Sequence, residues 1–161
     1  MAAKERIRKR VAAKRSIETK LEEGVLTEHE ARNARRVMDE CHSAVEQILR
    51  HECIGTELFP PLELRQYTES TPDKARTVLT FPPSAAFALS RRLTIWILLE
   101  LKDSASKIVT IHVASEYSDA DPADISVMPP SSVLYEGIFE EAVARGRLQE
   151  FLYETLDKVQ Q

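Results

Sequence analysis

The sequence predicts an α+β fold with an N-terminal helical hairpin or short coiled segment, an antiparallel β meander and two C-terminal helices. Three observations support this order. Residues 2–54 carry helical periodicity, alternating apolar segments occupy residues 76–116, and helical periodicity returns after residue 130. Helices grouped before and after a run of strands are typical of the α+β class. We therefore divide the chain into residues 1–54, the helical segment, and residues 55–161, the α+β domain.

The first predicted helix covers residues 2–23, which contain no Gly or Pro and are rich in Ala, Lys, Arg and Glu. Gly24 ends it in the position that favours a left-handed backbone. Its apolar stripe is narrow, because Lys14 interrupts it. A helix this polar is either held by a partner surface or frays.

The second predicted helix begins at a capping box formed by Thr27 and Glu30. Apolar residues then recur at alternating spacings of three and four, as in a short heptad seam, which fits a helical hairpin or a short coiled segment that packs on the body. The seam consists of Ala34, Val37, Cys41, Ala44 and Ile48. We expect these five residues to form a protein interface, in which the seam is buried against another helix.

The middle of the chain predicts three strands. Residues 76–81 form a short strand that ends at Pro82 and Pro83. Residues 93–101 are apolar on both faces, which indicates a central strand covered on both sides. After turn-forming residues at 103–106, residues 107–116 alternate between apolar and polar, so the two segments predict an antiparallel hairpin.

Irregular connectors and two helices complete the prediction. Residues 55–75 are punctuated by Gly and Pro, and residues 117–130 form an acidic loop. Ser131 or Ser132 caps a helix that carries Leu134, Ile138 and Ala142 on one side, and Gly146 divides that helix from the final one. Residues 85–90 fit either a strand or a short helical turn.

Charge is distributed unevenly along the chain. Residues 1–20 contain eight Lys and Arg against two Glu, a net charge of +6, and because the whole chain carries −4 the remainder carries −10. A basic arm on an acidic body indicates that the two parts meet different partners, or that one molecule's arm meets another molecule's body. The candidate contacts to nucleic acid or to an acidic partner are Arg6, Arg8, Lys9, Arg10, Lys14 and Arg15. The same clusters also fit a nuclear-localisation patch.

Motifs for common chemistries are absent from the sequence. The four glycines do not cluster, so there is no phosphate-binding glycine loop, and no G-x-S-x-G elbow occurs. His112 on a strand resembles a catalytic base, but no Ser or Cys nucleophile can be paired with it from the sequence. We therefore predict no catalytic residues and no cofactor.

Two groups of residues suggest metal sites. Cys41, His42, His51 and Cys53 are zinc-ligand types, but residues 42 and 51 of one continuous helix lie about 13 Å apart along its axis, too far for one ion. The acidic residues at 119–124 lack the Gly and the distant Glu of a calcium loop. We predict no metal.

Composition predicts a soluble protein inside the cell, in the cytoplasm or the nucleus. The two cysteines form no dense disulfide framework, and the charged N-terminus has no apolar signal core. The longest apolar run, residues 93–99, is too short to span a bilayer as a helix, so we predict no membrane contact.

The order of elements resembles that of RWD domains, which follow coiled-coil segments in subunits of kinetochore-type assemblies. The resemblance covers about residues 55–160: the meander at 76–81, 93–101 and 107–116, then Met128, Pro129 and Pro130, then the C-terminal helices. The Y-P-x-x-x-P signature common in that family is absent. The resemblance implies a non-catalytic dimerisation or docking module and assigns no binding residues.

Together these observations predict a non-enzymatic assembly protein, a scaffold or adaptor subunit. It forms a homo- or hetero-oligomer, with itself or with a protein partner, through its helical N-terminal segment. The alternative is a nucleic-acid-associated protein that binds phosphates through the basic arm. A third hypothesis, an enzyme, requires a deep pocket in which His112 is paired with a carboxylate.

Overall fold

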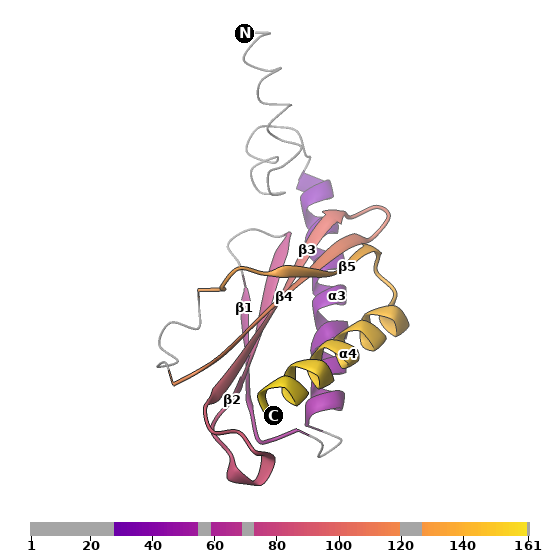
Figure 1. Ribbon diagram of the computed structural model, residues 1–161. Helices are drawn as coiled ribbons and strands as arrows, with labels where there is room; N and C mark the ends of the chain where they lie inside the picture. Colours follow the sequence, from indigo (N-terminus) through magenta and orange to yellow (C-terminus); the bar gives the residue numbers. More distant parts are fainter. Residues whose placement is uncertain (1–27, 55–58, 69–72, 120–126, 161) are drawn as a thin grey trace.

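The computed structural model describes residues 28–54, 59–68, 73–119 and 127–160 (Figure 1). Its elements, in chain order, are α3 (Glu28–Cys53), β1 (Glu63–Thr68), β2 (Lys74–Phe81), the 3-10 turn η1 (Ala85–Phe87), β3 (Arg92–Asp103), β4 (Ile108–Ser118), β5 (Ser132–Ile138) and α4 (Glu141–Gln160). None of the helices in these ranges is both long and apolar enough to cross a membrane.

The five strands form one antiparallel sheet in the order β1-β2-β3-β4-β5, so each strand pairs with its neighbour in sequence. The predicted α+β class and the predicted meander are confirmed, since β2, β3 and β4 cover the three expected strands. The predicted hairpin is β3 and β4, with Ile97 opposite Val113. The segment at 85–90, left open by the sequence, contains η1.

α3 and α4 cover the same face of the sheet, which makes a two-layer molecule (Figure 1). The residues of β3 with odd numbers, from Leu93 to Leu101, point into this shared core. On the opposite face, Val78, Trp96 and Ala114 form a small separate cluster against which Met128 packs. The prediction of a central strand that is apolar on both faces is therefore right, but the helices cover only one face.

The N-terminal half of the predicted hairpin, residues 2–23 with Gly24 and Thr27, lies outside the described residues. The second predicted helix is α3, whose buried residues share one core with the sheet and α4. The boundary predicted at residue 54 thus does not separate two cores, and residues 28–53 belong to the α+β unit.

The prediction of two C-terminal helices is wrong at its first helix. Residues 132–138 form β5, which pairs with β4. The pairing contains a bulge: Ile111 lies opposite Tyr135 and His112 lies opposite Val133, so β5 has one extra residue at this point. Leu134 and Ile138 were assigned to one side of a helix because they are four residues apart. That spacing also places two residues on one face of a regular strand, so it cannot distinguish the two structures.

The final helix, α4, is continuous from Glu141 to Gln160, and Gly146 lies inside it rather than between two helices. Gly146 is exposed, and an added Cβ at this position would have no neighbour within 4 Å. The helix tolerates Gly146 because its buried contacts come from the opposite side, at Ala144, Leu148 and Leu152.

Candidate interaction site on the outward face of α3

The seam predicted as a protein interface is part of the chain's own core. Ala34, Val37, Cys41 and Ile48 are between 0% and 3% exposed, and Ala44 is half-buried. The first four belong to the cluster that α3 shares with the sheet and α4. The prediction is corrected for a physical reason: a three-four spacing identifies an apolar helix face, but it does not specify whether a partner or the same chain covers that face.

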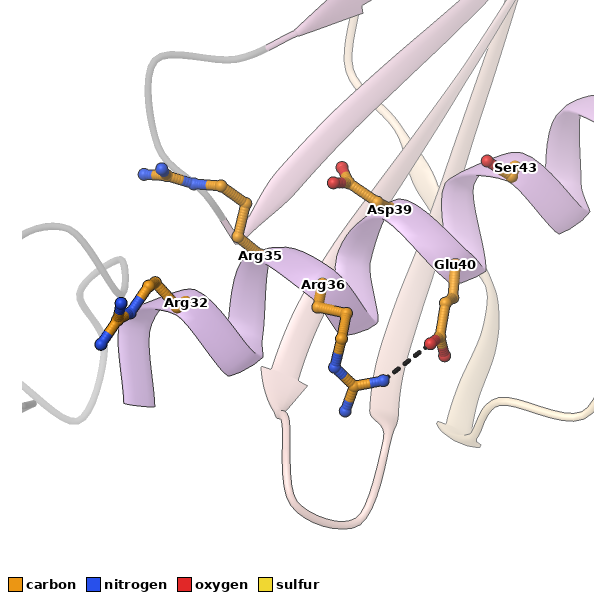
Figure 2. Close-up of a pocket in the computed structure, with 6 residues that line it drawn as sticks. All are labelled: Arg32, Arg35, Arg36, Asp39, Glu40 and Ser43. Carbon is orange, nitrogen blue, oxygen red and sulfur yellow. Dashed lines mark hydrogen bonds and ion pairs between the residues drawn. The ribbon is translucent and has the colours of Figure 1, made fainter. Parts of the chain in front are cut away.

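The opposite side of α3 faces solvent and is hollowed. A depression of about 550 Å³ is lined by Arg32, Arg35, Arg36, Asp39, Glu40 and Ser43 (Figure 2). These residues recur at spacings of three and four, so they follow one side of the helix. We call Arg32, Arg35 and Arg36 the arginine stripe.

Arg36 is held in place by its neighbours on α3. Its Nη1 donates to Glu40 Oε1 at 2.7 Å (Figure 2), and its Nη2 donates to Asn33 Oδ1 at 2.8 Å. The other oxygen of Glu40 lies 3.5 Å from Lys107 Nζ, in the turn between β3 and β4. These contacts are solvent-exposed, so they orient the guanidinium more than they stabilise the fold.

Arg32 and Arg35 form no ion pair within the described residues, and in Figure 2 they extend away from Asp39 and Glu40. A guanidinium presents a planar set of N–H donors that matches a carboxylate or a phosphate. The stripe therefore combines one oriented arginine with two that are available to a ligand. It can bind the carboxylates of an acidic protein surface or the phosphates of a nucleic acid.

The six candidate contacts of the basic arm, from Arg6 to Arg15, lie outside the described residues. Their role stays a prediction. The arginine stripe was not identified from the sequence, although the i, i+3, i+4 spacing of its residues was visible there. Knowing that it faces outward requires knowing which side of α3 the sheet covers.

A second polar group lies on the sheet face that the helices leave open. The side chain of Glu100 has Lys102 Nζ at 2.6 Å, His112 Nε2 at 3.5 Å and Lys74 Nζ at 3.8 Å. Burial raises the pKa of Glu100, but the bonds from Lys102 and His112 and the charge of Lys74 outweigh burial, so the pKa is lowered. The contacts join β2, β3 and β4 around a carboxylate that stays ionised.

His112 is thus paired with a carboxylate, one of the two features that the enzyme hypothesis requires. The sequence alone does not show that Glu100 and His112 lie together. The pairing follows from strand register: Glu100 lies opposite Thr110, and His112 is the next residue of β4 on the same face. Within the described residues, Glu100 forms ion pairs with Lys74 and Lys102, which neutralise its charge. The enzyme hypothesis also requires a deep pocket around His112, whereas the depression described above is lined by residues of α3.

The residues considered for zinc have different surroundings. Burial raises the pKa of the Cys41 thiol and raises the pKa of the Cys53 thiol to about 12. His42 Nε2 lies 3.1 Å from Thr77 Oγ1 on β2, and His51 is exposed. In the described ranges no three potential ligands come together to hold a metal ion.

Comparison with known proteins gives no relative: no family model, no curated protein and no solved structure matches this chain. The resemblance to RWD domains therefore stays a prediction. Any functional assignment therefore depends on the surfaces of the chain itself.

Proposed function

We propose that this chain is a non-enzymatic interaction domain that docks on an acidic protein surface through the outward face of α3. The observation that carries the proposal is that α3 has two distinct faces. One face is fixed in the core, and on the other face the arginine stripe lines the exposed depression.

Rigidity supports the proposal. α3 is 26 residues long and ten of its residues are buried, so its outward face cannot rearrange without disturbing the core. A binding surface that is already ordered loses less entropy when a partner arrives.

The proposal is tested with a fluorescently labelled glutamate-rich peptide as the acidic probe, in a titration followed by anisotropy. Arg32→Glu/Arg35→Glu reverses two charges of the stripe, and we expect it to weaken binding at least about tenfold. The matched control, Arg91→Glu/Arg147→Glu, makes the same change of net charge at two exposed arginines outside the depression. Equal weakening in both variants would show that only net charge matters and would contradict the proposal.

Nucleic-acid binding is the second candidate, favoured by the two arginines that have no ion pair in the described residues and by the +6 arm. The discriminating probe is a random-sequence duplex oligonucleotide with the same number of negative charges as the peptide. Tighter binding to the duplex, with affinity that falls steeply as salt rises, would favour nucleic acid. We expect the peptide to bind at least as tightly as the duplex.

A further inference from the structure

We infer that the acidic segment recognised by the arginine stripe also carries a basic residue, which pairs with Asp39 on the same face of α3. This inference rests on the proposed function and specifies the charge pattern of the partner. It follows from the order of charges along the depression, where Arg32 and Arg35 precede a carboxylate on the same side of the helix.

Asp39 lines the depression together with the arginine stripe, and it is exposed (Figure 2). Within the described residues its carboxylate forms no ion pair, because the guanidinium of Arg35, four residues earlier, extends away from it. The charge of Asp39 reaches His42, but burial lowers the pKa of that imidazole, which is therefore neutral at pH 7. The negative charge of Asp39 is thus left for a partner to match.

The other two charged residues of the depression already compensate each other. Arg36 Nη1 lies 2.7 Å from Glu40 Oε1, and the second oxygen of Glu40 lies 3.5 Å from Lys107 Nζ. The charges that remain are those of Arg32, Arg35 and Asp39, in the order positive, positive, negative. At 1.5 Å per residue, the last two are separated by about 6 Å along the helix axis, or about one turn.

This order discriminates between acidic partners. A segment that carries carboxylates alone can pair with Arg32 and Arg35, but it meets repulsion where it passes Asp39. A segment with a Lys or Arg about one helical turn beyond its carboxylates matches all three charges. Because exposed ion pairs are weak and are screened by salt, the preference should be modest and should be largest at low ionic strength.

The test is a double-mutant cycle between the full-length chain and a labelled alanine-based peptide of about 20 residues, long enough to form a helix. The peptide carries two glutamates three residues apart and a lysine four residues further on, the spacing of Arg32, Arg35 and Asp39. A second peptide has the reversed order, for a partner that runs in the opposite direction. In a third and a fourth, an alanine replaces the lysine.

Binding is followed by anisotropy at about 20 mM salt. In one of the two directions, the lysine should tighten binding to the wild-type chain by about threefold, and it should give no such gain with Asp39→Asn. The matched control is Glu28→Gln, which removes one negative charge from an exposed residue of α3 that does not line the depression. This variant should keep the threefold gain.

The inference is overturned if the lysine gives no gain with the wild-type chain, or the same gain with Asp39→Asn as with Glu28→Gln. If the lysine-free peptides still bind and Arg32→Glu/Arg35→Glu weakens that binding, the docking function stands and only the role of Asp39 falls. If that double substitution leaves the binding of every peptide unchanged, the proposed function falls as well. Circular dichroism of each variant confirms that the exposed substitutions leave the fold intact.

Discussion

Two residues one helical turn apart show how local contacts decide what a side chain can do. Arg36 is bonded to Asn33 and Glu40, whereas Arg32 has no ion pair in the described part of the chain. The sequence shows both as exposed basic residues. Their difference depends on rotamers and neighbours, which a pattern of residue types does not contain.

Glu100 should make stability depend on pH. Its pKa is lowered in the folded protein, so the ionised form stabilises the fold above the ordinary pKa of about 4.5, and this contribution is lost as pH falls through the lowered value. We expect Glu100→Gln to reduce the free energy of unfolding by about 1 kcal/mol at pH 7 and by much less at pH 3. Urea unfolding followed by the fluorescence of the single tryptophan, Trp96, measures both values; a difference that does not change with pH would contradict the assignment.

His42 should act in the opposite sense. Burial lowers its pKa below 6.5, although the nearby carboxylates of Glu46 and Asp39 oppose the shift. The unfolded chain therefore takes up the proton first, and the fold loses stability as pH falls below about 6.5. His42→Gln removes the titration while keeping a polar group near Thr77. The loss of stability between pH 7 and pH 5 should be smaller in this variant, and an unchanged loss would rule out His42 as its source.

Among the elements, the sequence predicted best where a pattern has only one structural interpretation. Strict alternation at 107–116 and double-sided apolarity at 93–101 correspond to β4 and β3. It failed at β5, where a spacing of four fits both a helix and a strand, and pairing with β4 decides the outcome. The prediction from sequence also failed at Gly146, because a glycine does not end a helix unless the chain also turns at that position.

The continuity of α4 leads to a stability prediction. Gly146 lies in the helix interior, and a methyl group added there meets no atom within 4 Å. Gly146→Ala should raise the free energy of unfolding by about 0.5–1 kcal/mol, because alanine loses less backbone entropy in a helix. Thermal unfolding by circular dichroism measures this change, and a decrease in melting temperature would indicate that the helix is interrupted at this position.

At the scale of the whole molecule, the sequence predicted charge asymmetry and an interaction role for the helical segment, but the face of α3 to which it assigned the contact is buried in the chain's own core. The seam from Ala34 to Ile48 is an apolar stripe of the right spacing for a coiled coil. Once the sheet exists, its apolar face is the nearest surface that can cover this stripe. The face left over carries the arginines, so our account assigns stability to one side of α3 and recognition to the other.

The most direct test compares one variant for each face of α3 in the same two assays, thermal unfolding and binding of the glutamate-rich peptide. Val37→Asp places a charge at a position that is 2% exposed and should destabilise the fold by more than about 3 kcal/mol. Arg32→Glu/Arg35→Glu should leave the melting temperature nearly unchanged and weaken peptide binding at least about tenfold. A Val37→Asp protein that stays folded but loses an oligomeric partner would contradict the account, since it would return the interface to the inward face of the helix.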